Sequence, residues 1–466
     1  MLDSAVVIPA ADLGAAPRAR SRSLAVALSF LWPGLGHWYV GRRRAALTYG
    51  LPVVVVLALV VVRVLQGVDT FAISLFDPSF ALTVIALTVA LGAWRLLAMS
   101  DAATEPGRRF GGARTTRMTL VVLGLAAILV HSVVVYYAYS FYSAGSKIFI
   151  GGAHADDDYS NGLLGSPQPS ELYLATPFAT PQSATSRVTV LLTGIDHTTS
   201  RTESLNDTLL IASVNPLTKT ISMVSFPRDV SEFPLYNGAT YHGKINSLME
   251  WAASHPQDFP DGPLPTLVHE LSYLLGIPIH YYAAVDLDGF RQMIDAVGGV
   301  TVTVQRAIDD PSYSYLDGTH GFYLAAGVQV LDGRTALAYV RSRKGDGDND
   351  FTRAGRQQQL LLALRARVTD PTVLARLPDL LSVAGETIRT DFPADRIAEM
   401  IDLTKSINGD GIKRVVLQPP TYSVHPPTNT TGGTYTLRLD LDAIARLSVE
   451  WFGADSRFAA KDAWVP

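Results

Sequence analysis

Residues 206–230 read NDTLLIASVNPLTKTISMVSFPRDV and contain two successive strand patterns. Residues 208–214 are mostly apolar, as in a buried strand, and residues 220–226 alternate between apolar and polar side chains. Asp207 begins the first strand, and Arg228 and Asp229 follow the second. Strand ends and the loops after them are where open α/β sheets bind ligands, so these charged residues are candidates for a binding site.

The pattern continues on both sides of this segment as strands that alternate with helices. Strands are expected at 188–192, 279–285, 299–304, 414–417 and 435–439, and helices at 264–275, 288–296, 335–339, 356–368, 373–384 and 394–406, with one more helix at the end. Such alternation predicts an α/β domain in which helices cover both faces of a sheet. The residues after 371 are expected to extend the same domain.

The composition of the 466-residue chain indicates a membrane protein. Charged residues make up 17% and apolar residues 48%, and the length is enough for two or three domains. The net charge of -4 gives no overall signal for nucleic-acid binding. The absence of cysteine excludes disulfides, zinc–thiolate sites and a cysteine nucleophile.

Three apolar segments near the N-terminus, residues 47–65, 79–99 and 118–139, are close to the roughly 20 residues that a membrane-spanning helix needs. A signal peptide is a poor interpretation, because several such segments occur and the first begins well inside the chain. Residues 24–40 are shorter and contain Pro33-Gly34, so we expect a re-entrant or interfacial hairpin there. A fourth plain span is the alternative.

Arginine clusters set the expected topology. They lie within residues 18–22, 42–44 and 108–117, and the positive-inside rule places all of them in the cytoplasm. The predicted order is therefore a cytoplasmic tail (1–23), a membrane region (24–142), a Gly/Ser/Pro-rich extracytoplasmic linker (143–186), an α/β domain (187–370) and its C-terminal extension (371–466). This describes a multi-pass cell-membrane protein whose α/β domain lies outside.

Residues 339–359, YVRSRKGDGDNDFTRAGRQQQ, contain four arginines, one lysine and three aspartates between two apolar runs. Arginine binds phosphate oxygens through a planar, bidentate guanidinium, and carboxylates beside it can hold a divalent cation. The pattern predicts a site for a pyrophosphate with a bound metal, and a solvated surface loop is the plain alternative. A calcium EF-hand is excluded, because Phe351 replaces the required glycine and Gln357 the required glutamate.

Six motifs follow one another over roughly residues 188–367: VLLTGID, NDTLLIASVNPLTKTISMVSFPRDV, KINSLMEWA, LLGIPIHYYAAVDLDGFRQMIDAVGGVTVTV, LDGRTALAYVRSR and DNDFTRAGRQQQ. In this order they resemble the LytR-CpsA-Psr family of cell-wall glycopolymer ligases. The resemblance implies a three-layer α/β/α sandwich outside the membrane, with a deep apolar pocket for a polyprenyl chain. It also implies transfer of a glycopolymer from a polyprenyl-pyrophosphate carrier to peptidoglycan, forming a phosphodiester and releasing polyprenyl phosphate.

The resemblance further implies a role for each matching residue. The pyrophosphate would be bound by Arg228, Arg341, Arg343 and Arg353, with Lys244, Arg356 and Gln357 also contacting the substrate; Asp207 and Asp350 would hold Mg²⁺ or Mn²⁺, and Asp196 would orient an arginine or act near the metal. The chain departs from the family at Leu205-Asn206, where Arg-Ser is common. One outer arginine is therefore missing, which bears on polymer specificity.

The resemblance and the residues together lead to three further expectations. The glycine- and acid-rich insertion 344–349 is expected to be mobile. Asp346 and Asp348 within it are expected to tolerate substitution, unlike Asp350. The helices at 264–275 and 290–297 are expected to line the lipid pocket, with ordinary hydrophobic core as the alternative.

The predicted function is that of a membrane phosphotransferase. Its partners would be the lipid-linked glycopolymer, a peptidoglycan acceptor and the lipid bilayer. Nucleic acid is not expected, because no basic recognition helix occurs. The alternatives are a polyprenyl-pyrophosphate phosphatase that uses water as acceptor, a non-catalytic wall-binding module, and an envelope regulator of the transcriptional-attenuator type.

Because the chain has no native cysteine, single cysteines can test its topology. Gly112→Cys, in the arginine-rich segment before the last expected span, should resist an impermeant thiol reagent in intact cells. Gly165→Cys, in the expected linker, should react with it. The reverse labelling pattern would place the α/β domain in the cytoplasm and overturn the predicted orientation.

Overall fold

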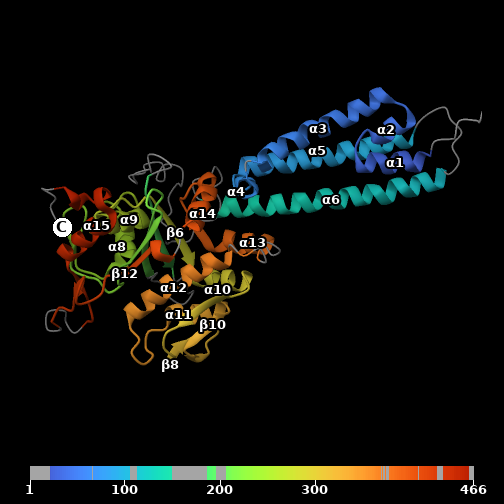
Figure 1. Ribbon diagram of the computed structural model, residues 1–466. Helices are drawn as coiled ribbons and strands as arrows, with labels where there is room; N and C mark the ends of the chain where they lie inside the picture. Colours follow the sequence, from blue (N-terminus) through green and yellow to red (C-terminus); the bar gives the residue numbers. More distant parts are fainter. Residues whose placement is uncertain are drawn as a thin grey trace, which may run out of the picture. The chain divides into compact units, whose positions relative to one another are not determined.

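The computed structural model describes residues 21–65, 67–104, 113–149, 186–195, 206–368, 370, 373, 377–407, 409–427 and 434–460 (Figure 1). The chain divides into two compact units. The first comprises Met1–Phe71 with Leu82–Tyr139, and the second comprises Ala72–Ala81 with Ser140–Pro466.

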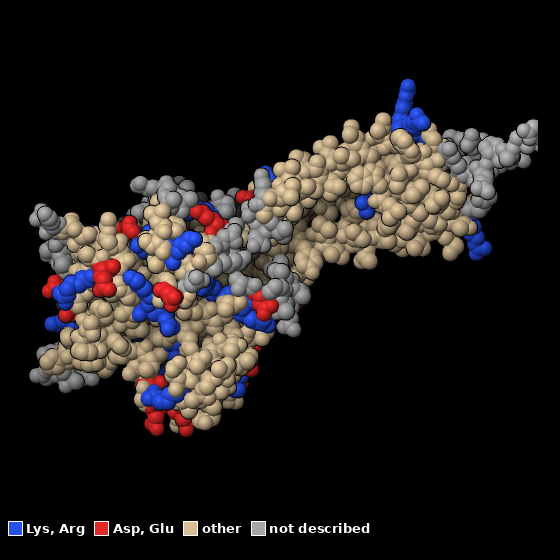
Figure 2. All heavy atoms as spheres, viewed as in Figure 1, with Lys and Arg blue, Asp and Glu red and all other residues tan. Residues whose placement is uncertain are grey.

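The first unit consists of apolar helices. Within the described ranges, three helices are long and apolar enough to cross a membrane: α3 (Arg43–Leu65), α5 (Pro78–Ala103) and α6 (Ala113–Ile148). Their outward side chains include many leucines and valines, and Figure 2 shows very little charge along them, with blue side chains gathered mainly toward one end. Helices that expose apolar side chains all round are typical of membrane spans, so they indicate membrane anchoring. The expected spans lie within these helices, although α6 continues into residues assigned to the linker; their sidedness stays a prediction.

Residues 24–40, expected to form a hairpin, fold as α1 (Arg22–Leu31), a tight reversal and α2 (Leu35–Val40). Gly34 enables the reversal, because its φ is 97° and a Cβ there would lie 2.3 Å from the carbonyl oxygen of Ala46. The buried His37 Nε2 lies 2.8 Å from Asp101 Oδ2 on α5, and Arg42 Nη1 lies 3.0 Å from the same oxygen. These contacts fix the helix pair to the end of α5.

The second unit is built on a mixed sheet. Its six described strands lie in the order β11 (Ile388–Thr390), β6 (Tyr281–Asp286), β1 (Val188–Ile195), β2 (Asn206–Asn215), β3 (Thr220–Ser225) and β12 (Ile412–Val416). β1 runs parallel to β6, and β12 runs parallel to β3, whereas the other neighbours are antiparallel. Residues 388–416 therefore supply both edges of the sheet.

Side chains alternate between the two faces of the sheet, and each face carries its own helices (Figure 1). Leu191, Ile211 and Val224 share one core with α8 (Leu248–Ser254), α9 (Pro263–Leu275) and α15 (Leu441–Phe452). Leu210 and Met223 face the other way, toward α12 (Asp350–Val368) and α14 (Ile397–Lys405). This arrangement confirms the expected three-layer α/β/α sandwich.

A second core lies beside this sandwich, where α10 (Leu287–Ala296) and α11 (Gly333–Arg341) pack with two small antiparallel pairs, β7 (Val300–Val304) with β10 (Gly327–Leu331) and β8 (Ile308–Ser314) with β9 (His320–Leu324). The sequence pattern indicated β7 but not β8, β9 or β10.

The remaining α-helices and β-strands are α4 (Val68–Ser74), β4 (Phe233–Pro234), β5 (Thr240–Tyr241), α13 (Leu377–Thr387), β13 (Ser423–Val424) and β14 (Arg438–Leu439). The helix expected at 356–368 begins at Asp350, and the strand expected at 435–439 is shorter than predicted.

One carboxyl group is buried within the main core. Glu270 of α9 is fully enclosed, and its Oε2 accepts a hydrogen bond of 3.1 Å from the backbone N–H of Tyr236. Burial raises the pKa of Glu270 to about 8, although this hydrogen bond acts to lower it. In the unfolded chain the group has its ordinary pKa of 4.5, so between these two values only the folded state keeps the proton.

The free energy of unfolding should therefore fall as pH rises from about 4.5 to 8, by about 1.4 kcal/mol per pH unit from this group. Glu270→Gln should remove this contribution to the slope, because an amide does not ionise. Thermal unfolding at several pH values across the window measures it, with the exposed Glu450→Gln as control. A Glu270→Gln slope equal to that of the control would contradict the assignment.

Candidate active site

The ends of several elements meet around an apolar pocket with a cavity volume of about 120 Å³. The C-terminal ends of the parallel strands β1 and β6 contribute to it, together with α10, α11 and α12. Its apolar lining consists of Leu192, Val285, Leu287, Phe290, Leu337, Val340, Leu360 and Leu361. Arg341, Arg353 and Gln357 line the same space. An apolar pocket bordered by arginines suits a ligand that has an apolar part and an anionic end.

The expectation that two helices line this pocket is half right. Phe290 of α10 does so, but no residue of α9 lies in the lining. The prediction for residues 264–275 is wrong, because Leu267 and Leu271 of α9 are fully buried in the core on the opposite face of the sheet. The sequence signal that would have identified the true lining was the pair of apolar runs, including Leu337 and Leu360, on either side of the arginine-rich stretch.

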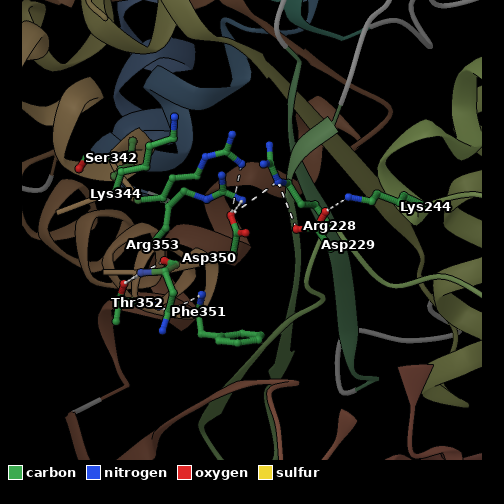
Figure 3. A network of polar contacts seen from close by, with 12 residues as sticks. Arg228, Asp229, Lys244, Ser342, Lys344, Asp350, Phe351, Thr352 and Arg353 are labelled. Carbon is green, nitrogen blue, oxygen red and sulfur yellow. Dashed lines mark hydrogen bonds and ion pairs between the residues drawn. The ribbon is translucent and has the colours of Figure 1, made fainter. Parts of the chain in front are cut away.

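Three arginines surround the carboxylate of Asp350, the first residue of α12 (Figure 3). Asp350 Oδ1 lies 3.1 Å from Arg353 Nη2, 3.6 Å from Arg228 Nε and 3.8 Å from Arg343 Nη1. The Arg353 side chain is only 6% exposed. Three guanidiniums facing one carboxylate leave an excess of positive charge, which suits a phosphate or pyrophosphate. The structure thus brings together three of the four predicted arginines, and Arg341 lies in the adjoining pocket wall.

A second acid borders this cluster. Asp229 Oδ1 lies 2.5 Å from Lys244 Nζ, and Asp229 Oδ2 lies 3.7 Å from Arg228 Nε. Burial raises the pKa of Asp229, and the charge of Asp350 adds to this, while Lys244 and Arg228 oppose it. Lys244, predicted to contact substrate, is thus paired with Asp229 at the edge of the cluster.

Arg356 does not join the cluster. Its Nη1 lies 2.9 Å from Asp348 Oδ2, and its Nη2 donates to the carbonyl oxygen of Ser342. The Asp348 side chain is only 6% exposed and also pairs with Arg306. These contacts therefore hold the insertion 344–349, which was expected to be mobile, in a fixed position. Arg356 links it to Ser342 at the end of α11.

Two residues of β8, which the sequence did not indicate, support the arginines of α11 and the following turn. Asp310 Oδ2 accepts hydrogen bonds from Ser342 Oγ at 2.8 Å, from the Arg343 N–H at 3.3 Å and from the Lys344 N–H at 3.2 Å. Burial acts to raise the pKa of Asp310, but hydrogen bonds from Ser342, Ser312 and Lys344 outweigh it, and the pKa lies below its ordinary value. Tyr313 is hydrogen-bonded to Arg341, and burial raises its pKa to about 12.

The three glutamines that follow the arginines tie α12 to different parts of the domain. Gln357 donates to the carbonyl oxygen of Val340 and lines the pocket. Gln358 donates to Ser225 Oγ on β3, and Gln359 donates to the carbonyl oxygen of Thr303 on β7. Of the three, only Gln357 lines the pocket, and its contact with substrate stays a prediction.

The metal prediction concerns three aspartates. Asp196 and the side chain of Asp207 lie outside the described residues, and Asp207 is placed only by its backbone in β2. No cluster of three or more possible metal-binding side chains occurs in the part of the chain that the structure describes. Asp350 Oδ1 makes no hydrogen bond to any described residue. Since Mg²⁺ often takes one or two carboxylates and completes its shell with phosphate oxygens and water, Asp350 fits one such ligand.

Comparison with known proteins gives a consistent family match. A model of the LytR_cpsA_psr family matches residues 158–448. The polyisoprenyl-teichoic acid–peptidoglycan teichoic acid transferase TagV of Bacillus subtilis (strain 168) is 31% identical over 227 residues, which are 48% of this chain and 54% of TagV. The like-named TagU of Halalkalibacterium halodurans is 31% identical over 218 residues, 47% of this chain and 65% of TagU. The chain thus spans between half and two thirds of these relatives.

Solved structures from the same group of proteins also match. The crystal structure of B. subtilis TagV matches with 25% sequence identity and a TM-score of 0.45. The match covers 57% of this chain and 96% of the TagV chain. A structure described as TagT bound to LIIa-WTA is 22% identical, with a TM-score of 0.43, and covers 57% of this chain and 90% of its own.

The buried pair with Arg356 reverses the expectation that Asp348 tolerates substitution as Asp346 does, and the two aspartates form a matched pair for testing this contact. Asp348→Ala should lower the free energy of unfolding by about 3 kcal/mol, because it leaves the buried Arg356 without its carboxylate. Asp346→Ala, at an exposed position two residues away, should change it by less than about 0.5 kcal/mol. Denaturant unfolding of the two variants measures the difference. Equal stabilities would show that the Asp348–Arg356 pair does not stabilise the insertion.

Proposed function

We propose a function for this chain from the premise that it belongs to the LytR_cpsA_psr family, whose model matches well over half of its length. The chain is a membrane-anchored phosphotransferase that moves a glycopolymer from a polyprenyl-pyrophosphate carrier to peptidoglycan. Two relatives of this chain are named as teichoic acid transferases, so a polymer of that class is the first donor to test.

One observation carries the proposal: the apolar pocket and the arginine cluster share Arg353. The pocket matches a polyprenyl chain, and the cluster matches the pyrophosphate attached to it. Neither a free nucleotide nor a soluble sugar phosphate would need the apolar part. The apolar helices of the first unit fit the same substrate, since a polyprenyl carrier resides in a bilayer. Exposure of the site on the outer side follows from the arginine clusters of the sequence and is part of the proposal.

The residues of the cluster would act mainly through their charge. In the transfer, an acceptor hydroxyl oxygen forms a bond to the phosphorus that carries the polymer, and its proton is released. The bridging P–O bond breaks, and its electron pair leaves with polyprenyl phosphate. Arg341 and Arg353, in the pocket wall, would stabilise the charge that develops on this leaving group. Arg228 and Arg343 would hold the phosphate that stays with the polymer.

Asp350 would orient these arginines and would contribute one ligand to a divalent cation. Mg²⁺ or Mn²⁺ bound there would neutralise negative charge between the two phosphates. We propose Asp207 as its second protein ligand and Asp196 as a neighbouring acid, on the strength of the motifs that carry them.

Arg353→Ala should reduce transfer by roughly 10²–10³-fold, because a charge-assisted donor to the reacting phosphate is lost. Arg353→Lys should recover little, since an ammonium cannot reproduce the bidentate guanidinium. The exposed Arg446→Ala on α15 is the matched control and should keep wild-type activity. The full-length protein is assayed in detergent with a lipid-linked teichoic acid and peptidoglycan. Near wild-type transfer by Arg353→Ala, with an unchanged unfolding temperature, would refute this role.

The same assay separates the alternatives. Release of polyprenyl phosphate without polymer attachment, with or without peptidoglycan, would identify a phosphatase. Binding of the donor without release of any product would identify a non-catalytic module. Attachment of polymer only when peptidoglycan is present supports the transferase.

A further inference from the structure

Two exposed aromatic side chains lie at the edge of the arginine cluster and have no part in the roles assigned above. The rings of His425 and Tyr435 have centroids 5.3 Å apart and an interplanar angle of 53°. Tyr435 is 51% exposed, so much of its ring is open to solvent. The two residues come from either side of residues 428–433, and their ring contact brings these two segments together.

The backbone places this pair next to Asp229. Leu437 donates to the Asp229 carbonyl oxygen at 2.9 Å, and Ser231 donates to the Leu437 carbonyl oxygen at 2.8 Å. Tyr435 lies two residues before Leu437 in the same segment. Burial raises the pKa of the Tyr435 phenol, and the negative charges of Asp229 and Asp350 raise this pKa further.

The pair lies away from the pocket. Neither His425, Tyr435 nor Asp229 belongs to the pocket lining, whereas Arg353 does. Figure 3 shows Arg353 on one side of the Asp350 carboxylate, and Arg228 and Asp229 on the other. In phosphoryl transfer the attacking and leaving oxygens are roughly in line. If the leaving lipid phosphate lies at the pocket, the acceptor must approach from the side of Asp229.

We propose that Tyr435 and His425 bind a pyranose ring of the acceptor glycan next to the reacting phosphate. This inference rests on the proposed transferase function and names the acceptor side of its site. A sugar ring presents an apolar C–H face that packs on an aromatic ring, and its hydroxyls suit the polar ends of tyrosine and histidine. The polyprenyl chain is accommodated elsewhere, and a phosphate would require arginines that this pair does not supply.

The kinetic test varies peptidoglycan acceptor and lipid-linked donor separately, with the full-length protein in detergent. Tyr435→Ala should raise the KM for acceptor by about tenfold, as expected for loss of an aromatic contact, and leave the KM for donor unchanged. Tyr435→Phe, which keeps the ring, should lie much closer to wild type. Tyr323→Ala removes an even more exposed tyrosine, at 68%, from the distant strand β9 and should behave as wild type.

A binding test makes the outcome independent of turnover. Saturation-transfer NMR with the disaccharide GlcNAc–MurNAc should show contact to the wild-type protein and to Tyr323→Ala, and a strong loss for Tyr435→Ala. Unchanged binding by Tyr435→Ala would overturn the inference, and so would a KM effect confined to the donor, which would assign the pair to the donor polymer. If the wild-type protein transfers no polymer at all, the proposed function fails, and the binding result alone then decides whether the pair holds a sugar.

Discussion

The site depends on holding like charges close together. Arg228, Arg343 and Arg353 all lie within 4 Å of one carboxylate oxygen of Asp350, at separations where guanidiniums repel one another. Asp350 offsets part of this repulsion, and its place at the N-terminus of α12 favours a negative charge there. The remaining positive charge is what an anionic substrate would neutralise. Holding these like charges close together therefore requires a rigid support.

That support comes from residues outside the arginine cluster. The three arginines belong to different segments: the loop after β3, the turn after α11, and α12 itself. Asp310 holds the turn through three hydrogen bonds, and the buried Asp348–Arg356 pair holds the following residues. Each supporting acid accepts hydrogen bonds or pairs with a base, as a buried carboxylate must. Removing either acid would leave the arginines free to move apart.

The sequence was informative where the signal is local. The strands β2 and β3 were predicted because alternation and apolar runs depend only on neighbouring residues. Strand β8 was missed because its sequence, with Asp309, Asp310 and Pro311, is unfavourable for a strand. Helix α9 was predicted correctly, but its apolar face says only that it is buried and not against which partner. One of the two helices assigned to the pocket, α9, therefore lies on the other face of the sheet.

The arginines of the site were predictable for a different reason. A guanidinium is suited to binding phosphate oxygens, so the residue type alone indicates a function. The motifs also place these arginines at the ends of helices and strands. Arg356 shows the limit of this reasoning, because its identity and spacing are the same as those of a ligand-binding arginine. Only its contact with Asp348, across a turn, distinguishes a structural arginine from a functional one. Asp310, 33 residues before Arg343, carries no signal at all in the sequence.

The order of strands in the sheet has a consequence for how the second unit is made. Both edge strands, β11 and β12, come from residues 388–416, while the four inner strands end at residue 286. A chain that emerges from its N-terminus therefore forms the inner strands first, with their outer backbone groups unpaired. Unpaired strand edges promote association with other chains, so the nascent domain is open to misassembly until residues 388–416 appear. During that interval the exposed edges of β3 and β6 are the surfaces at which such association would begin.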